Sequence, residues 1–448
     1  MATATLAIPP PIFSPFLDDQ CGKINAKGVS WEGYQRAKLV SAEEVTLLKS
    51  LERQPRSQKS ALFAQQGSTY AKLYIELLRK LQKVDTVQAV LVGISNMLGE
   101  PDTLPLFHNL RSSSDSKSDD PYGPLIKCLS MQDEFVLLES LRIMALLIST
   151  DPQPLPTEST TPLLNSLAKL TNSNPSPARD LAIQCLGAIL STRKIRHAVW
   201  EHDSLLSGLV KALKSNPTPQ LQYWIIVCFW ELSYEDEVAK GADKRFNLIP
   251  LLTEQAKHAA KEKVTRVIMA TLKNLLLIAP EVNVPSMIAA KLLTLVTSLS
   301  TRKWSDDDVI EDIGLLKSEL KDRLEGLTTY DEYVSEVSSG HLTWSAVHES
   351  EDFWKENAER LGTEGGGKTI KQLISLLSGT REPLVLSVGV HDVGKFLQYG
   401  GDRARKLVTD NGGKVKAMEL MAHDSPDVKY QALITVQRLM SQAWSTPS

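Results

Sequence analysis

The sequence is poor in cysteine, with four cysteines among 448 residues, at positions 21, 128, 185 and 228. None of them forms a C-x-x-C pair, so their spacing predicts neither a zinc ribbon nor a dithiol redox motif. A chain of this length can bury a large core without disulfide staples. The cysteine pattern therefore favours a reducing, cytosolic environment.

An excess of charge of either sign is also missing. Fifty lysines and arginines face 53 aspartates and glutamates, giving a formal net charge of -3. Such a balance lacks the basic field of nucleic-acid-binding proteins, and we expect no nucleic-acid partner.

Long hydrophobic runs are absent as well. The most apolar stretches, YWIIVCFWEL and LKNLLLIAP, are shorter than the roughly 20 residues that a membrane helix needs. The first residues, MATATLAIPPPIFSPF, lack the basic start of a signal peptide. We therefore expect no direct membrane insertion.

Apolar residues recur at helical spacing along most of the chain, and no run of alternating strands with Asn-Gly turns occurs. The sequence therefore predicts an all-α fold. One segment also recurs: LLNSLAKLTNSNPSP, from Leu163, is followed after about 42 residues by LLSGLVKALKSNPTP, from Leu205. That period is typical of HEAT and armadillo repeats.

A proline opens the helix that follows each copy of this segment. These helices begin at Pro177 and Pro219, and related ones begin at Pro383 and Pro426. Proline suits the first helical turn, where its missing N–H would have no helical partner anyway. Because these helices are apolar on more than one face, only neighbouring repeats can cover them. We predict an armadillo/HEAT-like helical repeat superhelix with Leu209 in its core.

The texture of the sequence changes near Thr329. In LKSELKDRLEGLTTYDEYVSEVSSG a charged amphipathic helix gives way to a polar stretch with serine and glycine. We predict an N-terminal repeat domain of residues 1–330 and a C-terminal helical repeat domain of residues 331–448. The polar, proline-bearing segments 111–124 and 151–162 are interpreted as mobile loops between helix pairs, with a phosphorylation site in either as the less common alternative.

The stretch GTEGGGKT, residues 362–369, matches the phosphate-binding pattern G-x-x-x-x-G-K-[ST]. A true P-loop follows a buried strand, whereas the preceding residues EDFWKENAERL have helical spacing and many charges. We interpret the stretch as a glycine-rich connection between two helices, with Lys368 and Thr369 opening the second.

One further pair invites an enzymatic interpretation. His391 and Asp392 form a His-Asp pair such as metal-dependent phosphohydrolases use, but the remaining histidines lack a matching spacing. We interpret the pair as solvated or as a helix cap. The sequence therefore predicts no enzyme and no catalytic, cofactor-binding or metal-binding residues.

Several longer tracts carry a family resemblance. They are VSWEGYQRAKLVSAEE, YAKLYIELLRKLQKVDTVQAVLVGISNML, KEKVTRVIMATLKNLL, SSGHLTWSAVHESEDFWKENAERL, VGVHDVGKFL and NGGKVKAMELMAHDSPDVKYQALITVQRLM. Together they resemble the regulatory H subunits of vacuolar-type proton ATPases (V-ATPases) over nearly the whole chain. The glycine-rich GTEGGGKT departs from that pattern, because relatives usually have a short polar link there.

The resemblance implies a non-catalytic, two-domain armadillo/HEAT superhelix without a cofactor. It implies partners within the proton pump: the peripheral stalk subunits E and G, the stator subunit a, and catalytic-core and rotor subunits. It also implies a cytoplasmic protein that lies peripherally on the cytosolic face of vacuolar and endosomal membranes. A generic armadillo/HEAT scaffold or transport adaptor is the alternative.

The function implied is regulatory. Such subunits are required for coupled ATP-driven proton transport, and they inhibit ATP hydrolysis by the cytosolic sector once it has detached from the membrane. We expect the inhibitory contact in a short link between two C-terminal helices, formed by Ser378, Gly379, Thr380, Arg381 and Glu382.

Overall fold

The computed structural model of the chain describes residues 12–441, except 53, 101, 113–119 and 326–328. Every regular element in this described part is a helix, which confirms the all-α prediction. Contacts group the chain into two compact units, residues 1–238 and 239–448.

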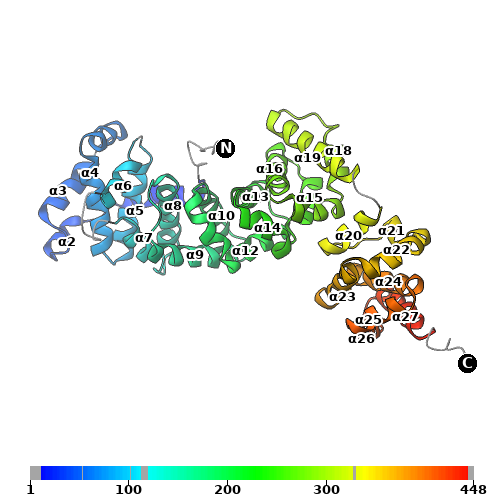
Figure 1. Cartoon of the computed structure of the whole chain (residues 1–448). Coiled ribbons are helices and arrows are strands. Elements are labelled where there is room, and N and C mark those ends of the chain that lie inside the picture. Colours follow the sequence, from blue (N-terminus) through cyan, green and yellow to red (C-terminus); the bar gives the residue numbers. More distant parts are fainter. Residues whose placement is uncertain (1–11, 53, 101, 113–119, 326–328, 442–448) are drawn as a thin grey trace, which may run out of the picture. The chain divides into compact units, whose positions relative to one another are not determined.

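The first unit is a stack of helices that follow one another in chain order (Figure 1). Its helices are α1 (Pro15–Lys27), α2 (Trp31–Arg36), α3 (Ala42–Glu52), α4 (Arg56–Lys80), α5 (Val84–Leu98), α6 (Leu104–Ser112), α7 (Tyr122–Cys128), α8 (Glu134–Thr150), α9 (Thr157–Thr171), α10 (Pro177–Leu190), α11 (Arg193–Trp200), α12 (Asp203–Lys214) and α13 (Pro219–Leu232). The next helix, α14 (Asp236–Phe246), crosses the boundary between the two units.

The predicted repeat is present in α9–α13. Helices α10 and α13 both carry proline in their first turn, and the side chains of Ser176 and Thr218 cap them by accepting backbone N–H groups. Helix α10 packs between α8 and α13 and is buried nearly all round, as a helix inside a stack must be. Leu209 is fully buried, which confirms its predicted core position.

The second unit continues the helical pattern. Its helices are α15 (Leu248–His258), α16 (Glu262–Ile278), α17 (Pro280–Ala289), α18 (Leu292–Leu299), α19 (Asp307–Glu325), α20 (Thr329–Ser339), α21 (Ala346–Glu349), α22 (Glu351–Thr363), α23 (Lys368–Gly379), α24 (Pro383–Tyr399), α25 (Gly401–Asp410), α26 (Gly413–Leu420) and α27 (Pro426–Ser441). A 3-10 turn, Glu364–Gly366, joins α22 to α23. The predicted related helices that begin at Pro383 and Pro426 are α24 and α27, and they pack against each other.

The segments on either side of the expected domain boundary touch. Helix α17 packs against α20, so the residues just after Thr329 are docked on the preceding helices. His341, in the loop after α20, places Nε2 3.7 Å from Oδ2 of Asp243 on α14. A division at residue 330 stays a prediction.

The two segments interpreted as loops are more ordered than the sequence indicates. Residues 113–119 of the first lie outside the described part, but α7 begins in that segment with the buried Tyr122. In the second, α9 begins at Thr157, so the expected loop is limited to residues 151–156. Asp151 anchors it, because its carboxylate accepts hydrogen bonds from Arg111 (2.7 Å) and Tyr122 (2.8 Å). The interpretation of 151–162 as a single mobile loop was therefore wrong.

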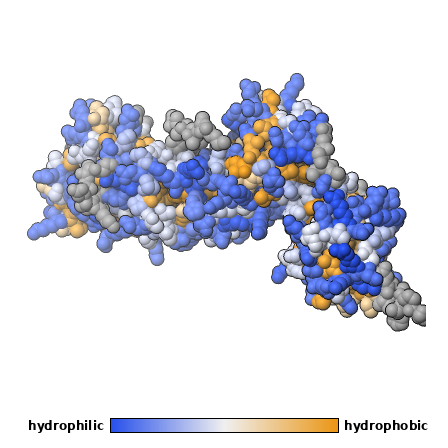
Figure 2. All heavy atoms as spheres, in the orientation of Figure 1, coloured by the Kyte–Doolittle hydropathy of each residue, from blue (hydrophilic) through white to orange (hydrophobic). Residues whose placement is uncertain are grey.

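Hydrophilic side chains dominate the face shown in Figure 2, with hydrophobic atoms breaking the surface in separate patches. Among the described residues, no helix alone has the length and hydropathy of a membrane span, although the bent pair α17 and α18 reaches them jointly.

Candidate functional site

The link between α23 and α24 contains the five residues in which the sequence places the inhibitory contact. Ser378 is in the last turn of α23, and Glu382 immediately precedes Pro383. The Thr380 backbone N–H donates to the Leu376 carbonyl (3.0 Å), which ends α23. The link is exposed apart from the half-buried Ser378 and Thr380. The structure thus brings all five residues together on one surface turn.

The conformation of this link follows from its own residues. Glu382 adopts extended backbone angles (φ -74°, ψ 117°), as the residue before a proline does. The Thr380 hydroxyl accepts the Glu382 N–H at 3.2 Å, which narrows the turn. Leu377 on one side and Val385 on the other are buried, so both ends are anchored in the core. The turn therefore presents Arg381 and Glu382 to solvent on a fixed base.

A buried histidine lies inside the same group of helices. Nδ1 of His348, on α21, is 2.8 Å from Oδ2 of Asp392 on α24, and its Nε2 is 2.7 Å from Oε2 of Glu336 on α20. His348 and Asp392 have no exposed surface, and Glu336 is nearly covered. We call these three residues the ionic cluster.

Burial alone lowers the pKa of His348, but Asp392 and Glu336 outweigh burial and raise the pKa to about 10. The imidazole ring is therefore protonated at neutral pH and donates to both carboxylates. Burial, together with Asp392, also raises the pKa of the neighbouring Tyr333 well above its usual range.

The ionic cluster connects three helices but cannot act on a substrate. Full burial of His348 leaves its ring nitrogens, both engaged, without access to a reacting group. Trp354 packs close by and donates its indole N–H to the His348 carbonyl at 3.0 Å. The arrangement is that of a structural clamp.

The cluster corrects the interpretation of the His-Asp pair. His391 is half-buried against the ring of Trp344 (centroids 5.0 Å apart) and contacts Asp392 at 3.1 Å. Asp392 is fully buried, so describing the pair as solvated or as a helix cap was wrong. No local signal reveals the cluster, because its residues are separated by 12 and 44 positions.

The glycine-rich stretch lies between α22 and α23, so the prediction that a helix precedes it is confirmed. Gly365, Gly366 and Gly367 have φ values of +56°, +68° and +76°, which glycine adopts most readily. Thr369 is 9% exposed, whereas the corresponding residue of a P-loop faces a bound magnesium ion. The stretch has the geometry of a helix-to-helix turn.

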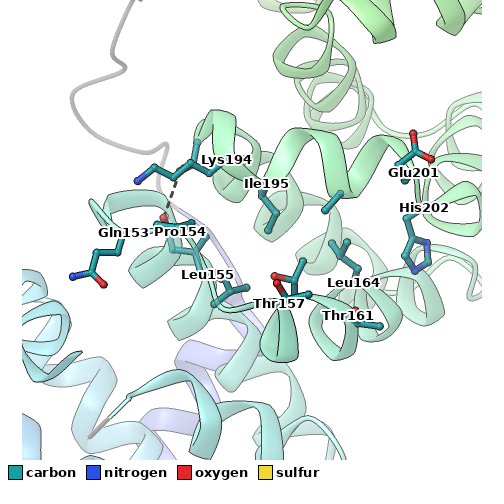
Figure 3. Close-up of a pocket in the computed structure, with 14 residues that line it drawn as sticks. Gln153, Pro154, Leu155, Thr157, Thr161, Leu164, Lys194, Ile195, Glu201 and His202 are labelled. Carbon is teal, nitrogen blue, oxygen red and sulfur yellow. Dashed lines mark hydrogen bonds between the residues drawn. The ribbon is translucent and has the colours of Figure 1, made fainter. Parts of the chain in front are cut away.

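A groove of about 520 Å³ lies in the first unit, between the loop after α8, the start of α9, and α11 (Figure 3). Leu155, Leu164 and Ile195 contribute apolar lining, and Lys194 donates to the Pro152 carbonyl at the edge. The His202 ring nearby is occupied, since its Nδ1 accepts the Leu205 N–H at the start of α12. The sequence did not predict this groove, because part of it lies in the segment interpreted as a loop.

A second group that the sequence analysis missed is on the surface. His197, Glu201 and Glu237 place an imidazole nitrogen and two carboxylate oxygens within 4.8 Å of one another, as a metal site requires. The four-residue spacing of His197 and Glu201 could have indicated half of this group.

Comparisons with known proteins cover nearly the whole chain. Two family models for the H subunit of V-ATPases match it, one for the N-terminal part over residues 15–320 and one for the C-terminal part over residues 326–444. The H subunit of the V-type proton ATPase of Drosophila melanogaster is 30% identical over 434 residues, which cover 96% of this chain and 90% of that protein.

Two further relatives are similar over comparable lengths. A probable V-type proton ATPase H subunit of Oryza sativa subsp. japonica is 29% identical over 92% of this chain and 94% of its own length. A probable V-type proton ATPase H subunit of Caenorhabditis elegans, the form numbered 2, is 30% identical over 93% of this chain and 89% of its own length.

Proposed function

The chain belongs to the family of V-ATPase H subunits, and from this premise we propose that it is a non-catalytic regulatory subunit of the cytosolic sector of a proton-pumping V-ATPase. In that role it supports coupled ATP-driven proton transport and inhibits ATP hydrolysis by the detached cytosolic sector. The observation that carries the proposal is the match of both family models, which together span residues 15–444 with a gap of a few residues.

The fold supports a binding role. Stacked helical repeats expose long surfaces on which other subunits can lie. The fully buried histidine of the ionic cluster clamps helices together and leaves that surface to make contacts. The partners we propose are the stalk subunits E and G, the stator subunit a, and catalytic-core and rotor subunits. The site of action is the cytosolic face of vacuolar and endosomal membranes, where the chain is held peripherally through the complex.

We further propose a division of labour at about residue 330, with residues 1–330 holding the stalk and residues 331–448 carrying the inhibitory contact. The two family models meet between residues 320 and 326, which supports this division. Movement of the C-terminal part would have to break the packing of α17 on α20. It would also separate His341 from Asp243; burial raises the pKa of that carboxyl, but hydrogen bonds from His341 and Ser286 outweigh burial and lower it.

The exposed link Ser378–Glu382 is the proposed point of inhibitory contact. Arg381 and Glu382 offer one charge of each sign on an anchored turn. Leu384, which is 48% exposed in the first turn of α24, adds apolar surface beside them. A second, tethered contact of this kind gains effective concentration, so a weak interface can stop rotation.

The test is a charge reversal in the link. Arg381→Glu should bind the detached cytosolic sector but inhibit its ATP hydrolysis less than the unchanged chain does. The matched control is Lys214→Glu, which reverses an exposed charge at the end of α12, before the corresponding link of the first unit. Equal inhibition by both variants and the unchanged chain would remove the link from the mechanism, whereas failure of the unchanged chain to bind or inhibit would overturn the proposed function.

A further inference from the structure

We propose that His197, Glu201 and Glu237 form a surface site for one divalent transition-metal ion of the zinc class. The site lies outside the contacts proposed above for pump regulation. It joins the end of α11 to the first turn of α14, two segments that a metal ion would tie together.

The backbone places the three side chains together. His197 is in the last turn of α11, and Glu201 caps that helix with helical angles (φ -74°, ψ -10°). Residues four positions apart on a helix share one face. Glu237 approaches this face from the start of α14, and the three potential ligand atoms lie within 4.8 Å of one another.

One of the ligand distances already fits a bound ion. Nδ1 of His197 is 3.4 Å from Oε2 of Glu237. Two atoms that each lie about 2.0 to 2.2 Å from a tetrahedral zinc ion are separated by roughly 3.4 Å. The exposed Glu201 side chain reaches a similar separation by changing its rotamer.

The charges of the site favour a cation. In the described part of the chain, the ion pair of Glu237 is with His197, and Glu201 forms none with a lysine or arginine. The basic side chains nearby are engaged elsewhere: Arg193 pairs with Glu235, and Lys194 donates to the Pro152 carbonyl. A dication would therefore relieve the repulsion between two adjacent carboxylates.

The donor set selects the class of metal. One imidazole nitrogen with carboxylate oxygens suits zinc and its first-row neighbours, whereas magnesium prefers oxygen alone. Water would fill the remaining positions, as in open zinc sites. His202 is not a ligand, because its ring is directed away from the Glu201 carboxylate (Figure 3) and caps α12.

The experiment is a Zn²⁺ titration of the full-length, metal-free chain by calorimetry, with Mg²⁺ as competitor and Co²⁺ absorption as a report of coordination. The chain supplies a matched control in Glu254 and His258, an exposed pair with the same four-residue spacing, 2.9 Å apart. That pair offers two ligands where the proposed site offers three.

We expect one saturable Zn²⁺ site that Mg²⁺ does not displace. His197→Ala or Glu237→Gln should weaken its affinity at least tenfold, and His258→Ala should leave it unchanged. Zn²⁺ should raise the melting temperature of the unchanged chain but not that of His197→Ala. Binding that does not saturate, or that falls equally in His258→Ala and His197→Ala, would overturn the proposal.

Discussion

His348 and Asp392 lie 2.8 Å apart with no surface exposed to solvent, although 44 positions separate them in the sequence. Glu336 engages the other ring nitrogen, so one buried imidazolium holds α20 and α24 to α21. Removing such a charge leaves its partners without compensation in a medium where charge is costly. The ionic cluster is therefore the most sensitive polar contact of the C-terminal helices.

His348→Gln should destabilise the chain by about 3 to 5 kcal/mol, because Asp392 and Glu336 would both stay buried without a cation. Urea unfolding of the purified chain measures this loss. His258→Gln is the control, since the same substitution there removes a histidine that is 76% exposed beside Glu254. A loss below about 0.5 kcal/mol in His348→Gln would show that the cluster stabilises nothing.

The stability of the second unit should depend on pH through the same residue. His348 titrates at about 10 in the folded chain, above its ordinary value of about 6.5, so the folded state holds the extra proton. Its contribution is fully present below pH 6.5 and is lost progressively as the pH rises towards 10. Unfolding free energies measured across that range should fall for the unchanged chain more steeply than for His348→Gln, and parallel curves would contradict this assignment.

Leu209→Ala should cost about 2 to 5 kcal/mol, because it deletes a fully buried side chain from the repeat core and leaves a cavity. The control is Leu277→Ala on α16, where the side chain is 52% exposed. Thermal and urea unfolding should separate the two variants clearly. Similar small losses in both would mean that the site of Leu209 collapses without cost.

The glycine-rich turn should tolerate loss of its lysine but not of its last glycine. Lys368→Ala removes one exposed charge and should leave ATP hydrolysis and proton pumping of the assembled enzyme unchanged. Gly367→Ala should destabilise by about 1 to 3 kcal/mol, since φ is +76° and the new Cβ would lie 2.5 Å from a Leu407 methyl group.

The measurements are calorimetry with ATP for Lys368→Ala and unfolding for Gly367→Ala. Saturable nucleotide binding that disappears in Lys368→Ala would restore the P-loop interpretation. A Gly367→Ala variant as stable as the unchanged chain would show that Leu407 moves aside freely.

The sequence by itself determined the helices and their repeat. Proline at the first turn of α10 and α13, the burial of Leu209 and the helix before Gly362 all follow from helical spacing and from the backbone limits of proline and glycine. These are properties of neighbouring residues, so a single chain displays them. The family resemblance adds function, because it is carried by tracts that the whole family shares.

Only the tertiary structure decided the polar chemistry. Asp392 is buried beside His348, Asp151 anchors an expected loop, and Glu237 meets His197, although nothing in the local sequence of any of them indicates its partner. Each pair lies on different helices, and the packing offset between those helices sets which side chains meet. Periodicity fixes the face of a helix that turns inward, but contact across helices depends on how far one slides along the next.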